Sequence, residues 1–404
     1  MSPSPKSPAD KAFTHGDHAC ACDTHCAATM RHRGFSLIEL MVGMLVSLIC
    51  ILAIMSAFAV YEGRKRTTTS GDDAQQSGSY SLYSLEQQIR TAGSGMVQGN
   101  RYGLWGCPME AWSSSTKRLP LAGALPAPFD TWPLATRAVP VLVADGGTDA
   151  GGNVLPDVIG IIGGNPALRV FKAPVTGTPD ASHVVLGNSF GINQGDYLLG
   201  IRSDGTCALA LAATAPDASN NITLSVPGSP STGLINTVNS YVFDMGTEPV
   251  ISLYGVDATS HSLVSFDLLQ RPVNGLAAAV LPVADGIVQI KALYGIHDGS
   301  GGAGEDPDVV DTWVQPTGAW SIGTLTATTA AAAAAMNQIK AVRVSIVAQS
   351  KLPEHASDYT NGGSLVLFPD QPTVKYTITT QPHYRYKVYD TTIPIHNALI
   401  TKYF

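Results

Sequence analysis

The sequence has 404 residues, of which 45% are hydrophobic and only 14% are charged, and its formal net charge at pH 7 is −7. This length can hold a membrane anchor together with one large or two small globular units. The negative charge argues against a nucleic-acid-binding protein, because such proteins normally carry a basic patch or stripe. Low charge with 40 glycines and 26 prolines is typical of a secreted, turn-rich β-domain.

The segment 1–33 contains thiol and imidazole side chains of the kind that bind zinc. No second Cys/His pair lies at the distance of a zinc finger and no core residues accompany the cluster, so we predict no metal site. Alternatively, translation starts at Met30 and leaves only the short basic leader Met-Arg-His-Arg-Gly. The cluster comprises His15, His18, Cys20, Cys22, His25 and Cys26.

From Phe35 to Tyr61 the sequence contains one charged residue, Glu39, and no proline. At about 1.5 Å per residue this stretch forms a helix of about 40 Å, which exceeds the hydrocarbon thickness of about 30 Å. We therefore predict a membrane-spanning helix. A cleavable signal peptide does not fit, because its apolar core is shorter and ends at a small-x-small site that is missing after Tyr61.

Glu39 is the unusual residue of this helix, because a carboxylate at the bilayer centre costs about 2.5 to 3.5 kcal/mol. It could lie in the headgroup layer, since it closely follows Arg33. Ser36 and Glu39 also fit a capping box, in which the carboxylate satisfies amides of the first turn. These residues alone leave both interpretations open.

The run GFSLIEL at residues 34–40 resembles the processing site of type IV pilins and pseudopilins. The resemblance implies that the prepilin peptidase cleaves after Gly34 and methylates the new terminal residue, Phe35. It also implies that Glu39 meets the terminal amine of a neighbouring subunit when helices bundle into a filament. Such a role is physically reasonable, because a buried carboxylate is tolerated when it is paired.

Basic residues flank the helix on both sides, so the positive-inside rule does not decide its orientation. The resemblance requires the peptidase to reach Gly34 from the cytoplasm. We therefore expect a single-pass inner-membrane protein with a periplasmic head that later reaches the pilus at the cell surface. The expected domains are a leader (1–34), a transmembrane helix (35–61), a helical stalk (62–96) and a β-rich head (97–404) of one or two subdomains.

The stalk is predicted to carry one apolar stripe, because hydrophobic residues recur at steps of three and four. Glycines weaken a helix by about 1 kcal/mol each, so we expect a break or a flexible joint between Gly63 and Gly78, and residues 70–73 offer a cap for a new start. Gly93 and Gly95 should end the helix. Residues 82–93 resemble the Leu-x-x-x-Ile-Arg-x-Ala-Gly segment of PilW-like minor pilins. The stripe comprises Leu82, Leu85, Ile89, Ala92 and Met96, with Ser81, Gln87, Gln88 and Arg90 elsewhere.

Beyond Val97, short runs rich in Val, Ile, Leu and Tyr are separated by Gly, Pro, Asn and Asp, which predicts strands joined by turns. A mostly antiparallel sheet packed on the N-terminal helix gives an α+β fold. The predicted strands are 139–144, 157–162, 182–186, 196–202, 206–211, 221–226, 240–244, 249–256 and 262–269.

Cys107 and Cys207 are the only cysteines outside the leader and the membrane segment. In an oxidising periplasm two such thiols most simply form a disulfide. Cys50 should stay unpaired within the spanning helix.

Three C-terminal segments resemble PilW-like minor pilins. In 285–298 a strand ends in Tyr-Gly and leads into an Asp/Gly-rich loop, and 338–346 is similar to that group's Val-x-Ala-Val-Arg-Val-x-Leu strand, preceded by a helix at 330–335. Residues 383–397 resemble its closing hairpin, although His396 stands where the group usually has Arg.

The loop at 298–311 offers carboxylates of the kind that bind calcium, but its spacing does not fit an EF-hand and acidic loops are usually only solvated. We expect no cofactor and keep Ca²⁺ as a weak alternative. No His-Glu-x-x-His motif occurs, and we predict that the protein is not an enzyme. The acids of the loop are Asp298, Glu305, Asp306, Asp308 and Asp311.

With this resemblance, the sequence predicts a minor pilin that primes type IV pilus assembly, with the pilus tip as one expected position and twitching motility and cell adhesion as its context. Expected partners are the prepilin peptidase, other minor pilins, the major pilin and the inner-membrane assembly platform, with a tip adhesin as a further candidate and no nucleic acid. The alternatives are a minor pseudopilin of type II secretion and a membrane-anchored surface-binding protein or adhesin.

Overall fold

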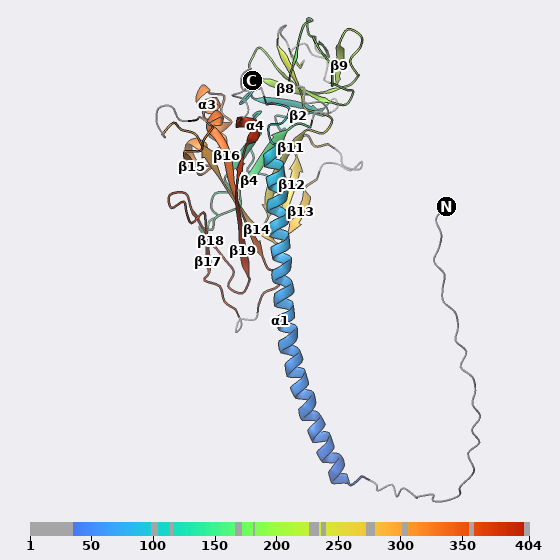
Figure 1. The fold of residues 1–404 in the computed structure, drawn as a ribbon, viewed down its shortest axis with the longest axis vertical. Helices are drawn as coiled ribbons and strands as arrows, with labels where there is room; N and C mark the ends of the chain where they lie inside the picture. The colour runs from blue at the N-terminus through green and yellow to red at the C-terminus, as the bar shows by residue number, and fades with distance from the viewer. Residues whose placement is uncertain are drawn as a thin grey trace, which may run out of the picture. The chain divides into compact units, whose positions relative to one another are not determined.

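A computed structural model of the chain describes residues 35–97, 104–113, 116–165, 172–180, 182–225, 234–235, 240–271, 279–300, 306, 308–354 and 359–399. Its elements are a long N-terminal helix followed by a head of mostly antiparallel sheets, which confirms the predicted α+β fold (Figure 1). The Cys/His cluster of the leader and Gly34 lie outside the described residues, so the predictions made for them are not tested.

The helix α1 (Leu37–Thr91) is continuous. The break predicted between Gly63 and Gly78 is therefore wrong, as is the cap predicted at residues 70–73. Each glycine costs only about 1 kcal/mol relative to alanine, a penalty that the hydrogen bonds and packing of the neighbouring turns offset. By its contacts the chain divides into two compact units, Met1–Glu62 and Gly63–Phe404.

Within the second unit, α1 buries a narrow face whose residues recur every three or four positions. Its first turns contribute small side chains, and its last turns contribute Leu85 and Ile89, which are completely buried. The predicted apolar stripe is confirmed, but Ser81, expected elsewhere, is also completely buried and donates a hydrogen bond to the Ser77 carbonyl oxygen at 2.7 Å. The buried helix residues are Ser70, Ala74, Gly78, Ser81, Leu85 and Ile89.

Two glycines stop the helix, as predicted. Gly93 and Gly95 have φ values of +79° and +78°, in the left-handed region that glycine adopts without strain. The Gly93 N–H donates to the Ile162 carbonyl oxygen at 2.7 Å, so the chain leaves the helix against a strand of the head. The helix ends at Thr91, and Met96, expected in its last turn, is buried in the segment that follows.

The first sheet of the head has eight strands, in the order β2-β1-β8-β7-β10-β5, with β9 beside β8 and β6 beside β9. The pair β1 and β8 is parallel, and the other pairs are antiparallel. The strands are β1 (Met109–Ser113), β2 (Thr116–Leu119), β5 (Ala173–Pro174), β6 (His183–Val185), β7 (Tyr197–Ile201), β8 (Cys207–Ala212), β9 (Asn221–Ser225) and β10 (Tyr241–Asp244).

The remaining sheets are antiparallel. The second sheet is β13 (Leu281–Asp285), β12 (Ser262–Asp267), β11 (Val250–Asp257), β4 (Val158–Gly163) and β3 (Val141–Ala144), in spatial order. The third is β15 (Thr312–Val314), β14 (Ile287–Ile296), β16 (Ile339–Gln349) and β19 (Tyr386–Pro394), and a fourth pairs β17 (Ser364–Leu367) with β18 (Tyr376–Thr379). Short helices are η3 (Gly318–Trp320), α2 (Ile322–Leu325), α3 (Ala330–Gln338) and α4 (His396–Leu399).

Every strand predicted between residues 139 and 269 is present, and so are the predicted helix at 330–335 and the strands within 285–298 and 338–346. The closing hairpin predicted for residues 383–397 is wrong. Residues 386–394 instead form one strand, because β19 pairs with β16 without interruption, and Thr391 and Thr392 face Val344 and Arg343 where a turn was expected. The prediction omitted the short strands β1, β2, β5, β13, β15, β17 and β18.

Gly78 lies where α1 approaches the third sheet most closely. A Cβ placed there would lie 2.2 Å from Cε2 of Tyr389, whereas a Cβ at Gly71 would have no atom within 4 Å. Gly78→Ala should therefore lower the thermal unfolding temperature of the detergent-solubilised chain, since overpacking typically costs about 1 to 3 kcal/mol.

Gly71→Ala is the matched control. It adds the same methyl group in open space and should raise stability by up to about 1 kcal/mol through helix propensity. Equal stability of the two variants would show that α1 does not contact the head at Gly78.

Candidate functional site

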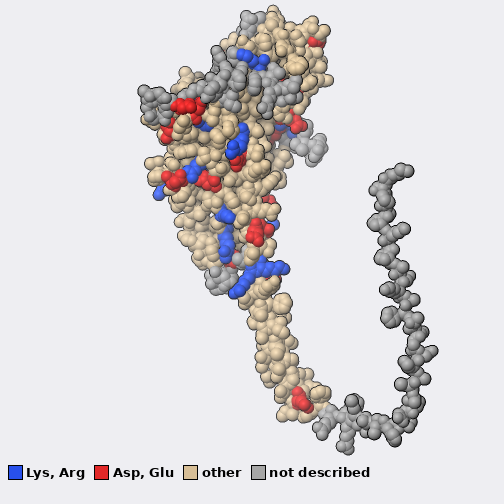
Figure 2. All heavy atoms as spheres, in the orientation of Figure 1, with Lys and Arg blue, Asp and Glu red and all other residues tan. Residues whose placement is uncertain are grey.

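The N-terminal part of α1 exposes an unusually large apolar surface. All described side chains from Phe35 to Lys65 are exposed, and Phe35 is 82% exposed. Figure 2 shows acidic atoms near the start of the described helix, followed by a stretch without Lys, Arg, Asp or Glu on the visible face. By length and composition this helix can cross a membrane. Soluble monomers rarely expose an apolar patch of this size, so lipid or other helices must cover it.

Glu39 is exposed on this surface. The helix begins at Leu37, and the first described backbone hydrogen bond runs from the Leu40 N–H to the Ser36 carbonyl oxygen at 3.1 Å. Within the described residues Glu39 has no hydrogen bond or ion pair. The roles predicted for Gly34, Phe35 and Glu39 concern the peptidase and a neighbouring subunit, so they stay predictions.

The end of α1 is fixed by the last residues of the described chain. The side-chain amide of Asn397 donates to the Ala92 carbonyl oxygen at 2.8 Å, which satisfies one of the free carbonyls at the helix end. A Cβ on Gly93 would lie 3.1 Å from that of Asn397, so the two segments are in close contact. The segments that resemble PilW-like pilins, 82–93 and 383–397, thus meet although they are far apart in sequence.

His396 is the residue that departs from the expected Arg. Its Nε2 lies 3.5 Å from Nη1 of Arg90 on α1. A neutral imidazole can accept a hydrogen bond from a guanidinium, whereas a second arginine cannot. The contact explains why histidine is compatible with Arg90 at this position.

Nearer the N-terminus of α1, at Ser70 and Gln75, β19 and the chain after β16 contact the helix through hydrogen bonds. The Tyr389 hydroxyl donates to the Gln75 carbonyl oxygen at 3.0 Å, and Nζ of Lys387 donates to Oε1 of Gln75 at 2.8 Å. The Leu352 N–H donates to the Ser70 hydroxyl at 3.3 Å. We call the contacts of Ser70, Gln75, Gly78, Ala92 and Gly93 with the third sheet and α4 the helix seam.

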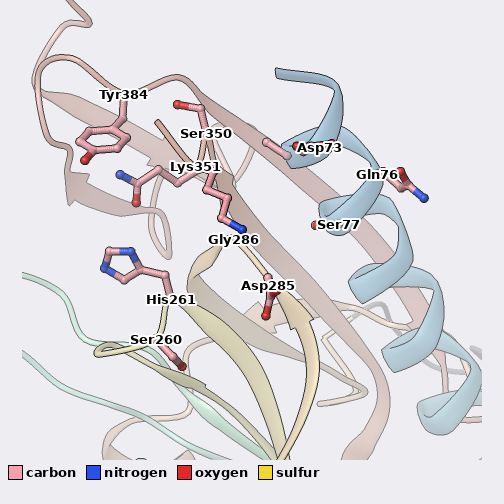
Figure 3. Close-up of a pocket in the computed structure, with 12 residues that line it drawn as sticks. Asp73, Gln76, Ser77, Ser260, His261, Asp285, Gly286, Ser350, Lys351 and Tyr384 are labelled. Carbon is pink, nitrogen blue, oxygen red and sulfur yellow. The ribbon is translucent and has the colours of Figure 1, made fainter. Parts of the chain in front are cut away.

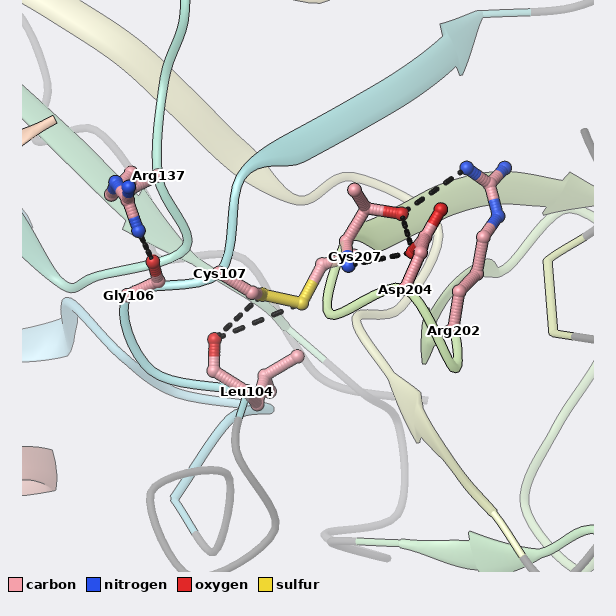
Figure 4. The surroundings of a disulfide bond; sticks show 8 residues. Leu104, Gly106, Cys107, Arg137, Arg202, Asp204 and Cys207 are labelled. Carbon is pink, nitrogen blue, oxygen red and sulfur yellow. Dashed lines mark hydrogen bonds between the residues drawn. A yellow bond between two sulfur atoms is a disulfide. The ribbon is translucent and has the colours of Figure 1, made fainter. Parts of the chain in front are cut away.

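A disulfide joins Cys107 to Cys207, as predicted, with a Cα–Cα distance of 5.7 Å (Figure 4). Both cysteines are buried, and the carbonyl oxygen of Leu104 lies against the two sulfur atoms. Cys207 is the first residue of β8, whose parallel partner β1 begins two residues after Cys107. The bond therefore fixes the start of the parallel pair. Cys50 is free and exposed, also as predicted.

Replacing both cysteines, Cys107→Ser with Cys207→Ser, should strongly destabilise the head. The bond spans 100 residues, and in the chain-entropy model a loop of that size contributes about 4 to 5 kcal/mol. The expected result is a lower midpoint in urea unfolding, whereas the control Cys50→Ser should leave it unchanged. A midpoint unaffected by the double change would contradict a stabilising role.

A cavity of about 420 Å³ lies between α1 and the head within the second unit. Asp73 and Ser77 of α1 face His261, Asp285 and Lys351 across it (Figure 3). Side chains of both charges line it, so water and small polar groups fit it better than an apolar ligand. Sequence analysis did not identify this cavity, because its lining comes from five separate segments.

The acidic loop uses its carboxylates to close itself. Oδ2 of Asp311 accepts N–H groups of Asp298 at 3.0 Å and Gly299 at 3.1 Å, and it lies 2.9 Å from Nδ1 of His297. In the part of the chain that the structure describes, no three His, Cys, Asp or Glu side chains are placed to hold a metal ion. Glu305 lies outside that part, and Ca²⁺ binding by the loop stays an untested alternative.

Sequence analysis also missed a buried charge cluster formed by Asp145, Asp157 and Lys291. Lys291 and Asp157 are completely buried, at the junction of the second and third sheets. Burial raises the pKa of the Asp157 carboxyl to about 7, against the opposing effect of Lys291. The available signal was Lys291 itself, a lysine inside the apolar run of β14, because a buried lysine requires a partner.

Two family models match the chain. The model for Type IV Pilus-assembly protein W, PilW, matches residues 253–397, and the model for the prokaryotic N-terminal methylation motif matches residues 29–55. These matches support a PilW-like type IV pilin. Neither the curated proteins nor the solved structures contain a significant match.

The PilW match contains the whole third sheet and the outer strands β12 and β13 of the second. The methylation-motif match contains the start of the exposed apolar helix. Together they support a minor pilin associated with the type IV pilus, and the motif with its apolar helix fits a membrane-anchored pilin that interacts with other pilus components. Both families are structural parts of the pilus.

Proposed function

We propose that the prepilin peptidase cleaves this PilW-like pilin after Gly34 and methylates Phe35, and that the mature subunit primes pilus assembly with other minor pilins. The observation that carries the proposal is the exposed apolar helix with one charge, Glu39, within the matched methylation motif. Cleavage would leave Phe35 as a free amine close to Glu39 in sequence. Two such helices packed side by side can pair that amine with the carboxylate of the neighbour.

The pairing sets the register between helices. Burying a lone carboxylate among lipid or packed helices costs free energy. An opposite charge at the same depth in the membrane removes most of that cost. The partners we propose are the other minor pilins, the major pilin and the inner-membrane assembly platform, with the N-terminus in the cytoplasm and the head in the periplasm. The corresponding domains are 1–34, 35–61, 62–96 and 97–404.

The size of the head supports a position at the pilus tip. Its sheets extend from residue 109 to residue 394, whereas a subunit repeated along a shaft must leave room for the subunit stacked above it. A bulky head fits best where no further subunit follows. A tip adhesin is then a candidate neighbour.

The second candidate function is that of a minor pseudopilin in type II secretion, which has the same N-terminal motif. The PilW match over the third sheet favours the pilus. A membrane-anchored adhesin would use the helix only as an anchor, and Glu39 would then be dispensable.

The decisive variant is Glu39→Ala. Removing one partner of a buried ion pair costs about 3 kcal/mol or more, which corresponds to at least about a hundredfold weaker subunit incorporation. We expect the variant to be membrane-bound and folded but to produce very few surface pili, counted by electron microscopy.

Glu62→Ala is the matched control, because Glu62 is an exposed acid of the same helix outside the apolar stretch. It should leave piliation at the wild-type level. Normal piliation with Glu39→Ala would support a helix that serves only as a membrane anchor. Loss of secretion of a type II substrate with pili retained would support the pseudopilin.

Mass spectrometry of the mature protein should show methylated Phe35 as its first residue, and a retained Gly34 would rule out the processing step.

A further inference from the structure

The buried charge cluster brings three segments into contact. Asp145 follows β3, Asp157 precedes β4, and Lys291 lies in the middle of β14. Nζ of Lys291 lies 2.5 Å from Oδ1 of Asp157 and 2.8 Å from Oδ1 of Asp145. The Tyr376 ring covers the amine, with its centroid 4.6 Å from Nζ. An amine and a carboxyl are therefore held in contact where water is excluded.

This site disfavours the charged form of the Asp157 carboxyl, which is completely buried. Taking an ammonium and a carboxylate out of water is expensive, and their mutual attraction often fails to compensate. The raised pKa of Asp157 follows from its burial and gives the carboxyl a large protonated fraction at neutral pH. Transfer of one proton from the Lys291 ammonium to Asp157 produces a free amine beside a carboxylic acid, which are the nucleophile and electrophile of amide formation.

The backbone polarises the acid. The Ala292 N–H donates to Oδ2 of Asp157 at 2.9 Å, and the Gly146 N–H donates to Oδ1 at 3.1 Å. Two fixed donors of this kind stabilise the negative charge that develops on a carboxyl under attack. Contact geometry within a fold also supplies the very high effective concentration that an uncatalysed reaction in solution lacks.

Asp145 can transfer a proton from the attacking nitrogen of Lys291 to the oxygen that leaves Asp157. Its carboxylate contacts Nζ of Lys291 and retains 22% of its side-chain exposure, whereas Lys291 and Asp157 have none. It therefore connects the buried amine with solvent. A carboxylate in this position can accept a proton from the attacking nitrogen and deliver it to the leaving oxygen.

We propose that Lys291 and Asp157 form an intramolecular amide bond, with Asp145 as the proton acceptor. The bond from Nζ to Cγ of Asp157 forms and one C–O bond of the acid breaks. That oxygen leaves as water, with the acid proton and one proton of the amine. The reaction needs no oxidant, cofactor or other enzyme, and it replaces two buried ionisable groups by a neutral amide.

The bond would join the second sheet to the third. Asp157 leads into β4 and Lys291 belongs to β14, and the two residues are 134 positions apart. Their backbones already meet, because the Asp157 N–H donates to the Ile290 carbonyl oxygen at 2.9 Å. The two sheets would then stay connected when the head is pulled against its helix.

The test is the mass of the intact mature chain purified from membranes in detergent, measured after reduction of the disulfide. We expect a mass lower by one water molecule than that of the same chain with free side chains. Trypsin should fail to cleave after Lys291, and tandem mass spectrometry should find one branched peptide containing Asp157 and Lys291. A full mass with normal cleavage after Lys291 would overturn the proposal and leave a permanent ion pair.

Single substitutions identify the two side chains that the amide bond joins. Lys291→Met and Asp157→Ala should each show no loss of water. In Lys340→Met the loss should persist, because Lys340 lies on the third sheet with its Nζ 3.9 Å from an Asp308 oxygen and is not the linked lysine. Water loss confined to the Asp145-Gly146 peptide would indicate a cyclic imide there and would also overturn the proposal.

Asp145→Asn tests the proton acceptor. It keeps both reacting groups and removes the carboxylate, so the folded variant should retain most of its molecules at full mass. Near-ultraviolet circular dichroism confirms that this variant is folded. Complete linkage in it would overturn the role of Asp145, while the wild-type measurement decides the bond itself.

Discussion

An apolar helix surface must be covered by lipid or by protein, and α1 meets this requirement in two ways along one continuous helix. Its first half exposes large apolar side chains and one acid, so that its cover must come from a membrane or from neighbouring helices. Its second half buries a narrow face against the head.

The seam depends on small residues and on polar contacts with the end of the chain. Gly78 allows Tyr389 to approach, and Asn397 satisfies a carbonyl at the helix end. The residues involved belong to the segments that resemble PilW-like pilins. In this chain they attach the third sheet to α1, and Nε2 of His396 lies 3.5 Å from Nη1 of Arg90.

Two kinds of cross-connection hold the head together. The disulfide fixes the parallel pair of β1 and β8 in the first sheet. The cluster of Asp145, Asp157 and Lys291 connects the second and third sheets, where a buried lysine would otherwise be unfavourable. Only Lys291 lies within the PilW match, so the cluster combines the matched region with the part of the head that precedes it.

The sequence by itself determined the features whose signals are local or unique: the apolar span with Glu39, the glycines that stop α1, the strands bounded by turn residues, and the pairing of the two remaining cysteines. Only the tertiary structure decided that Ser81 is buried, that β19 continues where a hairpin was expected, and that Lys291 meets two aspartates. The physical reason is that these outcomes depend on partners distant in sequence. Strand pairing with β16 overrides a local turn tendency, and the free energy of a buried charge depends on the groups that the fold places beside it.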